Sequence, residues 1–483
     1  MPLSDLEQAG VLIIGAGPAG LACAATLLEQ SDLHVTIVDA GTGPGGQYWR
    51  QPAPALDPAD PERLRPESLR GLHHDLGTFE DLRSRVEEGR AAGRAIVLAE
   101  HHVWTAGVVD GSHVVHAVDR SGGPGRERAV ALRARHLVVA TGAHDRSLPF
   151  PGWDLPGVMT AGGLQALLKS GDVTAGRRVA VGGTGPFLLP VAAGLADRGA
   201  TVVGVFEANT PTRWLRELRA VAANRGKLGE GAGYAKALLR RRVPVHTRTM
   251  VVEAHGRDRV EAVTVARLDN AGRPRRDTLR RIEVDAVGVG WGFSPQLDLP
   301  VTLGCRLTTD ASGASVVEVD EWQRTSRPGV SAAGEACGVG GAALAVAEGH
   351  LSAYGIVGDA AGAAEGVQRL RSEIERLRAF AAAMHRAHPV PAGWADLVRA
   401  DTVVCRCEEV TAGAVRRAVT ERGATDVRQV KQLTRAGMGW CQGRVCGYGV
   451  ELLAGGGPQV PTERLVSTPV PLGTLGHIEK GAM

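Results

Sequence analysis

Unbroken apolar runs followed by glycine-rich turns recur along the chain and predict an α/β fold. The first run, Val11–Ile14, is typical of a parallel strand that is buried on both faces. The turn after it leads into an apolar helix that ends near Glu29, and His34–Asp39 predicts the next strand. A second β–α–β unit repeats the pattern, with a strand at Val179–Val181, a helix that ends at Arg198 and a strand at Thr201–Glu207.

Between and after the two units, alternating polar and apolar residues predict antiparallel strands. The segments with this alternation are Ile96–His116, Ala129–Ala140, Val251–Leu268 and Arg281–Val289. A final strand and helix are predicted within Gly329–Ala353. Apolar residues at three- and four-residue spacing then predict a surface helix over Glu365–His385 that docks on its own domain.

Composition narrows the class of protein. The chain has 483 residues, 44% of them hydrophobic and 22% charged, which is enough for a large core and two to four domains. Its formal charge of +3 is too small to indicate nucleic acid or an acidic membrane surface as a partner. The long uncharged stretches, Val11–Leu28 and Val179–Ala196, are interrupted by glycine-rich turns, so a strand and a buried helix explain them better than a membrane span. The N-terminus lacks the basic segment of a signal peptide, and we expect a cytoplasmic protein without a transmembrane segment.

The first turn has the spacing of a dinucleotide-binding fingerprint, Gly15-x-Gly17-x-x-Gly20. In this pattern the first glycine makes the tight turn, the second lets the backbone approach a pyrophosphate, and the third lets helix and strand pack closely. The free N–H groups at the start of the helix attract the phosphates. Asp39 ends the next strand, where a carboxylate accepts the ribose hydroxyls. These residues predict a dinucleotide site, without separating FAD from NAD.

Two later segments favour FAD. Val138–Gly142 resembles the ATG motif of flavoproteins with two dinucleotide-binding domains, and Val330–Glu335 resembles their terminal flavin motif. In that family the acid after the glycine, here Glu335 rather than the commoner aspartate, meets the ribityl chain and the pyrophosphate. The helix that starts at Gly341 would direct its positive end to the flavin pyrimidine. We expect the following residues to bind FAD: Gly15, Gly17, Pro18, Ala19, Gly20, Asp39, Gly46, Gln47, Thr141, Gly142, Gly334, Glu335, Gly341, Ala342 and Ala343.

The second β–α–β unit has a damaged fingerprint. Gly183 and Gly185 occupy its first two glycine positions, and Pro186 fills an intervening one. Leu188 stands where the third glycine belongs, and a leucine there forces the helix away from the strand. Glu207, at the end of the next strand, could still hold a ribose. The sequence leaves open whether Gly183, Gly185, Pro186 and Glu207 form a nucleotide pocket or a vestigial scaffold.

Four of the seven cysteines lie near the C-terminus, as Cys405-x-Cys407, then 33 residues, then Cys441-x4-Cys446. Two short helices predicted between the pairs would bring the four thiols together. Four thiolates on two tight turns suit a [2Fe–2S] cluster, which we favour. Structural zinc is the alternative because it also accepts four thiolates, although zinc sites prefer two to four residues between paired cysteines.

Several segments together resemble a family of bacterial enzyme subunits. They are Ala140–Ala143, Pro149–Trp153, Leu155–Gly162, Gly185–Ala192, Gly437–Cys446 and Thr468–Gly473. They are similar to the A-type subunit of opine oxidases, the B subunit of hydrogen cyanide synthase, and the alpha subunits of multi-subunit proline and hydroxyproline dehydrogenases. The cysteine segment is similar to bacterioferritin-associated ferredoxin.

The resemblance implies a division of labour between subunits. A separate FAD subunit (beta), similar to D-amino-acid oxidase, oxidises a C–N bond, and the present chain carries FAD and the iron–sulfur centre and passes electrons onward. The resemblance also implies a hetero-oligomer, in some relatives with a small additional subunit, FMN at a subunit interface and an adenine nucleotide (NAD or ATP) in the second site. No Ser-His-Asp or paired-carboxylate arrangement is evident in the sequence, so no catalytic residue is assigned.

We therefore expect two Rossmann-like dinucleotide-binding domains, of the two-dinucleotide-binding flavoprotein type, and a small helical [2Fe–2S] domain. Residues 1–150 and 285–362 would form the FAD-binding domain, 151–284 the second nucleotide-binding-like domain, 363–400 a linker helix, and 401–483 the [2Fe–2S] domain and C-terminal tail. A chain that ends before Asp401 should then still bind FAD. Two other functions stay open: a self-contained NAD(P)H-dependent reductase, and a non-enzymatic iron–sulfur carrier or sensor.

Overall fold

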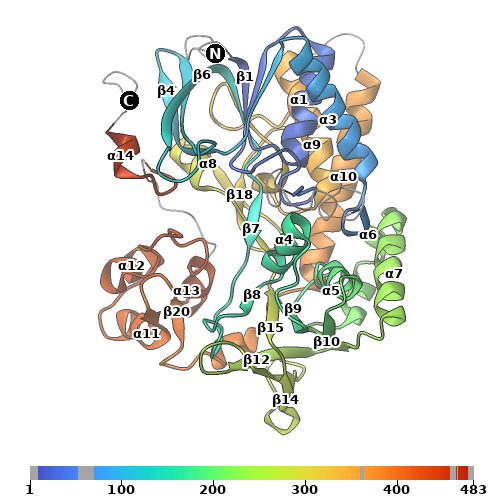
Figure 1. Ribbon diagram of the computed structural model, residues 1–483, viewed down its shortest axis with the longest axis vertical. Coiled ribbons are helices and arrows are strands. Elements are labelled where there is room, and N and C mark those ends of the chain that lie inside the picture. The colour runs from blue at the N-terminus through green and yellow to red at the C-terminus, as the bar shows by residue number, and fades with distance from the viewer. Residues whose placement is uncertain (1–8, 53–69, 359–363, 457–463, 465, 477–483) are drawn as a thin grey trace.

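The structure is a computed structural model, and it describes residues 9–52, 70–358, 364–456, 464 and 466–476. Two α/β units are stacked along the long axis, and the cysteine-rich segment lies beside the lower one (Figure 1). The chain passes from the first unit to the second through β7 (Ala143–Asp145) and returns through β16 (Phe293–Pro295), and these two strands pair antiparallel. Within the described residues, no helix is long and apolar enough to span a membrane.

The first unit is built on a seven-stranded sheet. Its strands are β1 (Ala9–Ile14), β2 (Val35–Val38), β3 (Ala95–Leu98), β4 (His101–Val109), β5 (Ser112–Asp119), β6 (Arg128–Val139) and β19 (Val330–Ala332). The parallel part has the order β3-β2-β1-β6, and β19 joins the last residues of β6. β4 and β5 extend the sheet as an antiparallel meander from the earlier part of β6.

The long helices of this unit are α1 (Pro18–Gln30), α3 (Leu76–Ala91), α9 (Ala342–Val357) and α10 (Ala364–Ala387). α1 and α9 approach so closely that a Cβ at Gly349 would lie 2.2 Å from the carbonyl oxygen of Ala19. The helix predicted over residues 365–385 is α10, and it packs on α9 through Val367, Ile374 and Leu377. α10 also reaches the second unit, where Arg386 pairs with Glu217.

The second unit has a parallel sheet with the order β11-β10-β9-β15-β8. Its strands are β8 (Val158–Thr160), β9 (Arg178–Gly183), β10 (Thr201–Glu207), β11 (Val245–Thr247) and β15 (Ala286–Gly290). The helices are α4 (Ala161–Gly171), α5 (Leu188–Asp197), α6 (Leu218–Ala223) and α7 (Arg225–Arg240). A separate antiparallel sheet follows, formed by β12 (Thr249–His255), β13 (Ala262–Arg267) and β14 (Arg280–Glu283).

Two of the expected strand arrangements were wrong. β3, which opens the segment expected to be antiparallel, pairs parallel with β2. The expected strand over 281–289 is divided between β14 in the antiparallel sheet and β15 in the parallel sheet. Asp285 lies at the division, where its carboxylate accepts hydrogen bonds from the N–H groups of Arg177 (3.0 Å) and Arg178 (2.8 Å) at the start of β9. Since β15 lies in the second sheet, we propose that this unit extends to Gly290 instead of ending at residue 284.

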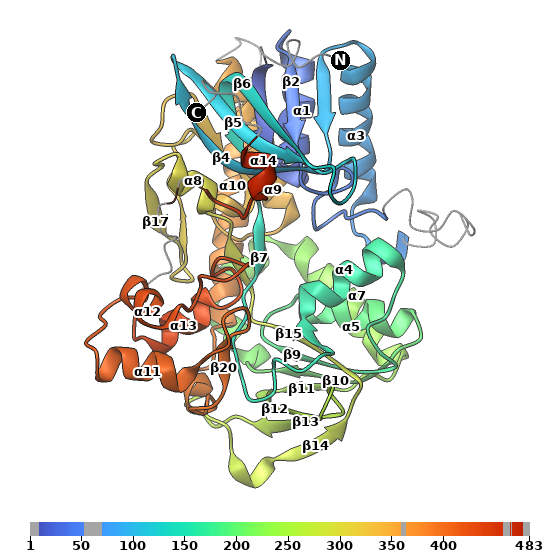
Figure 2. The ribbon, with the colours of Figure 1, turned by 60° about the vertical axis from the view of Figure 1, so that its left-hand side comes forward.

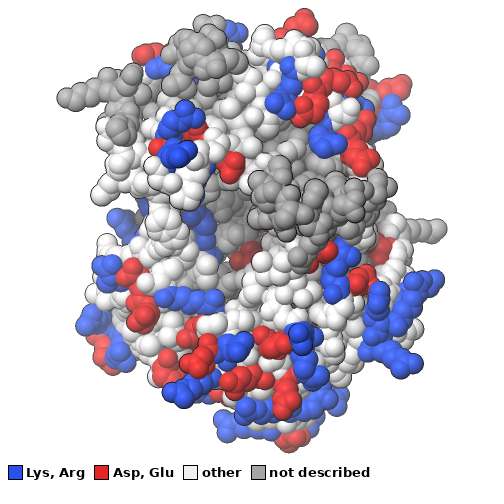
Figure 3. Space-filling view, viewed as in Figure 1, with Lys and Arg blue, Asp and Glu red and all other residues white. Residues whose placement is uncertain are grey.

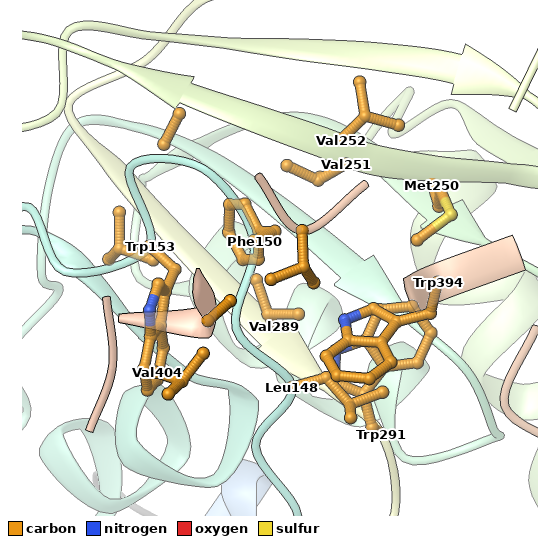
Figure 4. Close-up of a cluster of buried hydrophobic side chains, with 14 of the residues drawn as sticks. Leu148, Phe150, Trp153, Met250, Val251, Val252, Val289, Trp291, Trp394 and Val404 are labelled. Atoms are coloured by element: carbon orange, nitrogen blue, oxygen red, sulfur yellow. The ribbon is translucent and has the colours of Figure 1, made fainter. Parts of the chain in front are cut away.

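The cysteine-rich segment comprises β20 (Val403–Cys405), β21 (Val410–Thr411), α11 (Ala412–Thr420), α12 (Val427–Thr434) and α13 (Gly447–Leu453). Its core is continuous with that of the second unit, and Trp153, Phe150 and Val404 meet at the junction (Figure 4). The indole N–H of Trp153 donates to the carbonyl oxygen of Val403 at 2.5 Å. The segment therefore shares its core with the second unit, and we propose that it does not fold independently of that unit.

The tail after this segment returns to the first unit. Ser467 donates through its backbone N–H and its hydroxyl to the carbonyl oxygen of Trp104 on β4, both at 2.7 Å. α14 (Leu472–Leu475) then lies beside the β4–β5–β6 meander (Figure 2). The last part of the chain thus spans both units.

Candidate functional site

The turn between β1 and α1 gives each fingerprint glycine a different structural task. Gly15 has φ +109°, and a Cβ there would lie 2.2 Å from the carbonyl oxygen of Ala140. Gly20 packs helix against strand, because its Cβ would lie 1.9 Å from the carbonyl oxygen of Gly15. Gly17 faces open space, and its Cβ would meet only Gly46 Cα, at 3.9 Å. This opening before the free N–H groups of α1 fits a pyrophosphate.

Asp39 follows β2, and its carboxylate lies against the same turn. Oδ2 accepts a hydrogen bond from Ala16 N and Oδ1 accepts one from Gly41 N, both at 2.6 Å. The carboxylate is thereby fixed, and its remaining lone pairs can accept ribose hydroxyls. Gly46 (φ +59°) lies against Gly17, so that a Cβ at Gly46 would be 2.8 Å from Gly17 Cα. The side chain of the neighbouring Gln47 accepts hydrogen bonds from Arg50.

The ATG-like and terminal flavin motifs lie at the ends of β6 and β19, next to the glycine turn. The Thr141 hydroxyl donates to the carbonyl oxygen of Gln296 at 3.0 Å, and Gly142 (φ +73°) has no atom within 4 Å of an added Cβ. Burial raises the pKa of Glu335 to about 7, although a hydrogen bond from Gly341 N opposes the rise. The sites expected from three separated motifs are therefore brought together at one edge of the sheet.

α9 begins at Ala342, one residue after Gly341, whose φ of +89° ends the preceding turn. Ala342 and Ala343 line a cavity of about 770 Å³ between the two units, together with Tyr48 and Tyr234. The N-terminus of α9, which is the positive end of its dipole, directs free N–H groups toward a ligand bound in this cavity. An electron-rich flavin pyrimidine fits that position.

Glu348 on α9 is a buried residue that sequence reasoning missed. Its side chain is fully buried, and Oε2 accepts a hydrogen bond from Gly334 N at 2.8 Å. Oε1 lies 2.8 Å from Arg378 Nη2 of α10, and Arg378 also donates to the carbonyl oxygen of Cys337. Burial raises the pKa of Glu348 to about 7, with Arg378 opposing the rise. The signal available in the sequence was a lone acid in an otherwise apolar helix.

The turn of the second unit differs in its path. α5 begins at Leu188, five residues after Gly183, whereas α1 begins three residues after Gly15. Gly183 still makes a close approach, since its Cβ would lie 1.8 Å from the carbonyl oxygen of Gly290. Pro186 and Phe187 fill the extra turn before the helix. The damaged fingerprint therefore keeps the tight turn but displaces the helix N-terminus.

Glu207 ends β10 at the position equivalent to Asp39, but its carboxylate is occupied. Oε1 accepts hydrogen bonds from the Thr184 hydroxyl and from Asn209 N, and Oε2 accepts one from Gly185 N, all at 2.8 Å. His388, after α10, lies 3.6 Å away. Burial raises the pKa of Glu207, but these partners together hold it below its ordinary value.

The four C-terminal cysteines lie together. Cys405 and Cys446 are buried, and Cys407 is exposed. The Cys446 thiol, shared as a hydrogen-bond donor between Cys405 and Cys441, lowers the pKa of both of these thiols, while the pKa of Cys446 itself rises. Two thiols thus favour the thiolate form that ligates iron. Among the residues that the structure describes, no three His, Cys, Asp or Glu side chains surround a single metal-ion position.

Glycines shape the loop that carries the second cysteine pair. Gly437 (φ +81°) and Gly443 (φ +89°) both adopt the left-handed conformation and approach each other. A Cβ at Gly439 would lie 2.2 Å from Cys407 Cβ, so this glycine lets the loop close on the first cysteine pair. The donor set and the tight turns fit a [2Fe–2S] cluster.

Comparison with known families agrees with this geometry. Residues 9–349 match the family described as pyridine nucleotide-disulphide oxidoreductase, and residues 403–453 match the BFD-like [2Fe-2S] binding domain. The chain belongs to the pyridine nucleotide-disulphide oxidoreductase family and carries a BFD-like domain at its C-terminal end. The predicted fold class is confirmed, and both matches support FAD and a [2Fe–2S] cluster as cofactors.

Individual proteins show which members of this family the chain resembles. Hydrogen cyanide synthase subunit HcnB of Pseudomonas aeruginosa is 36% identical, over 90% of this chain and 91% of that protein. The A subunit of opine oxidase from Rhizobium meliloti is 34% identical, over 92% of this chain and 91% of that protein. In the solved structures, L-proline dehydrogenase from P. horikoshii has the same fold, with a TM-score of 0.66, 19% identity, and coverage of 97% of this chain and 80% of that one. The predicted resemblance to these oxidoreductase subunits is confirmed.

Proposed function

We propose that this chain is the electron-transferring flavoprotein and iron–sulfur subunit of a multi-subunit amine or amino-acid dehydrogenase or oxidase. The observation that carries the proposal is the contact between its two redox sites. Residues 437–446, which carry Cys441 and Cys446, are called the cysteine loop below. Its Arg444 donates a hydrogen bond to Asp298. Two residues earlier, the backbone of Gln296 forms hydrogen bonds with the ATG-like motif. Sites joined this closely suit electron transfer between them.

The proposed donor is a partner subunit with its own FAD, similar to D-amino-acid oxidase. The named relatives support this, because hydrogen cyanide synthase subunit HcnB and the A subunit of opine oxidase are both parts of larger enzymes. The partner would oxidise a CH–NH or CH–NH₂ group to C=N, which releases two electrons and two protons. The proposed substrates are opine-, proline- or glycine-like.

The chain's own residues would hold the two centres in place. FAD accepts electrons in pairs or singly, and a [2Fe–2S] cluster carries one electron at a time. The α1 N-terminus behind Gly17 binds the pyrophosphate, Asp39 accepts the ribose hydroxyls, and the α9 N-terminus faces the flavin pyrimidine. Cys405, Cys407, Cys441 and Cys446 ligate the iron.

The proposal includes three further components. FMN would bind at the interface with the partner, a small additional subunit would complete the complex, and an adenine nucleotide (NAD or ATP) would occupy the second unit near Gly183, Gly185 and Pro186. Because Glu207 is already engaged, such a nucleotide would have to bind without it. Basic and acidic side chains intermingle on the face in Figure 3, so a partner docking there meets no field of a single sign.

Steady-state assays of the lone chain and of the reconstituted complex test the proposal. We expect dye-linked oxidation of an amino acid or opine only with the partner FAD subunit present. Titration of the lone chain should show bound flavin together with two iron and two sulfide per chain. Robust turnover of amino acids by the lone chain would contradict the division of labour. Fast NADH oxidation would instead support a self-contained reductase, against which the displaced α5 and the occupied Glu207 count.

A further inference from the structure

The carboxylate of Asp298 lies between the cysteine loop and the first unit. Asp298 opens the short helix α8 (Asp298–Thr302), and its side chain is 11% exposed. Oδ2 accepts a hydrogen bond from Arg444 Nη2 at 3.0 Å, and Oδ1 lies 3.4 Å from Arg464 Nη2. Both arginine side chains are 21% exposed, so the pairs are shielded from solvent more than surface ion pairs are.

Both arginines hold the loop that carries Cys441. Arg444 lies between Cys441 and Cys446 in the chain. Arg464 donates to the side chain of Gln442 and, at 3.3 Å, to the carbonyl oxygen of Gln442. Gln442 (φ +53°) in turn donates to the carbonyl oxygens of Met438 (3.1 Å) and Gly439 (3.0 Å). The contacts of Arg444 and Arg464 therefore hold the loop just after Cys441, and the Gln442 side chain ties it to the residues just before Cys441.

On its other side, Asp298 is tied to the ATG-like motif. Gln296 Nε2 donates to Asp298 Oδ2 at 2.9 Å. Gln296 N donates to the carbonyl oxygen of Gly142 at 2.9 Å, and the carbonyl oxygen of Gln296 accepts from the Thr141 hydroxyl at 3.0 Å. One chain of contacts from Arg444 to the ATG-like motif thus passes through the Asp298 side chain and residues 296–298. His144, just after that motif, also bonds the backbone of Arg444.

We propose that Asp298 is a positioning residue that docks the cysteine loop on the flavin motif and thereby sets the distance between cluster and flavin. The inference rests on the proposed function. Electron transfer between two centres slows steeply with their separation, so a small shift of the loop is enough to change the rate. A cavity of about 250 Å³ lined by Asp298, Arg444 and Arg464 gives the loop room to shift once the pairs are broken.

Contacts that do not include Asp298 hold the rest of the cysteine-rich segment in place. A change at Asp298 can therefore move the loop without unfolding the segment. Trp153 bonds Val403, and Arg406 lies over the Trp153 ring at 4.0 Å. These contacts do not involve Asp298. Removing its charge should therefore loosen the loop while the segment stays folded.

The test uses Asp298→Asn in the full chain, with both cofactors loaded. We expect at least a tenfold slower transfer from photoreduced flavin to the cluster, and faster hydrogen exchange in residues 438–444. Flavin, iron and sulfide content and the EPR g-values of the reduced cluster should stay at wild-type values, and the protein should stay folded with a moderately lower Tm. Arg464→Gln removes the second arginine that contacts Asp298, and this residue lies outside the cysteine loop. It should also slow the transfer, by a smaller factor.

The matched control is Glu253→Gln, which removes an ion pair with Arg399 (3.0 Å) that joins the second unit to the chain just before the cysteine-rich segment. It should change neither the transfer rate nor the exchange. Wild-type exchange and wild-type transfer in both Asp298→Asn and Arg464→Gln would overturn the inference. A wild-type chain with no flavin-to-cluster transfer would overturn the proposed function instead, and hydrogen exchange would still decide whether Asp298 docks the loop.

Discussion

The two β–α–β units are built to one plan but differ at the start of the helix. In the first unit, α1 begins at Pro18, directly after the open Gly17. In the second unit, the apolar Leu188 is buried where the third glycine would stand, and α5 begins two residues later in the turn. The difference teaches that the strand–turn–helix plan alone does not make a phosphate site, because the helix N-terminus must also come close to the strand.

The acids at the strand ends diverge in the same way. Asp39 is fixed by two backbone N–H groups and keeps free lone pairs. Glu207 receives three hydrogen bonds, and Asn209, one of its donors, also bonds the carbonyl oxygen of Pro389 after α10. The second unit has thus used its acid to hold its own turn. The core of this unit is also continuous with that of the cysteine-rich segment, so the unit supports that segment whether or not a nucleotide binds to it.

The largest effect should come from removing that segment. A chain that ends before Asp401 uncovers Leu148, Phe150 and Trp153, at about 1.5–3 kcal/mol for each large side chain exposed. We expect an aggregating or strongly destabilised protein in thermal unfolding, with the second unit opening first in hydrogen exchange. A chain ending at Gly476 is the control, because it keeps every described element. A soluble fragment with wild-type Tm and bound flavin would show that the segment is separable after all.

Gly17→Val tests the open side of the first turn. The backbone there is compatible with valine (φ −77°), so the protein should fold, but the side chain would fill the pyrophosphate position. We expect FAD affinity to fall about 1,000-fold, or about 4 kcal/mol, in flavin titrations. Gly43→Val, at a loop position with no atom within 4 Å, should bind FAD normally. Unchanged flavin content in Gly17→Val would refute the site.

Leu188→Ala tests the scaffold role of the second turn. Leu188 is buried in the core of the second unit, so its truncation should cost about 2–5 kcal/mol of the free energy of unfolding. FAD binding should not change, and NADH oxidation should not appear, because the helix start stays displaced. Chemical denaturation with a flavin titration measures both. Gain of NADH oxidation would mean that this side chain alone blocks a nucleotide site.

The smallest effect concerns pH and the buried acid of the first unit. The pKa of Glu348 is raised from 4.5 to about 7 in the folded chain, so its stability contribution is complete below about pH 4.5 and is lost as the pH rises through 7. Relative to Glu348→Gln, the wild type should lose up to ~3 kcal/mol of the free energy of unfolding between pH 5 and 8. A difference between the two proteins that does not vary with pH would contradict the raised pKa.

The local patterns of the chain were sufficient to identify the two β–α–β units, the first fingerprint and the four cysteines. The run Val11–Ile14 and the glycine spacing after it specify strand, turn and helix through contacts a few residues apart. The effect of Leu188 on the second fingerprint could also be predicted from the sequence, because the third glycine position has a steric requirement that does not depend on the rest of the fold.

Tertiary structure decided the features that depend on distant partners. Strand β15 joins the parallel sheet by pairing with β9, and Asp285 beside it bonds the backbone of Arg177 and Arg178, more than 100 residues earlier. The cysteine-rich segment looks separable in sequence, yet Trp153 anchors it across 250 residues. Glu348, Arg378 and Asp298 acquire their roles only from what they face, since one charged residue in a sequence does not reveal its partner. Burial and pairing of charges are properties of the folded chain, and this is why the link between the two redox sites had to be seen in three dimensions.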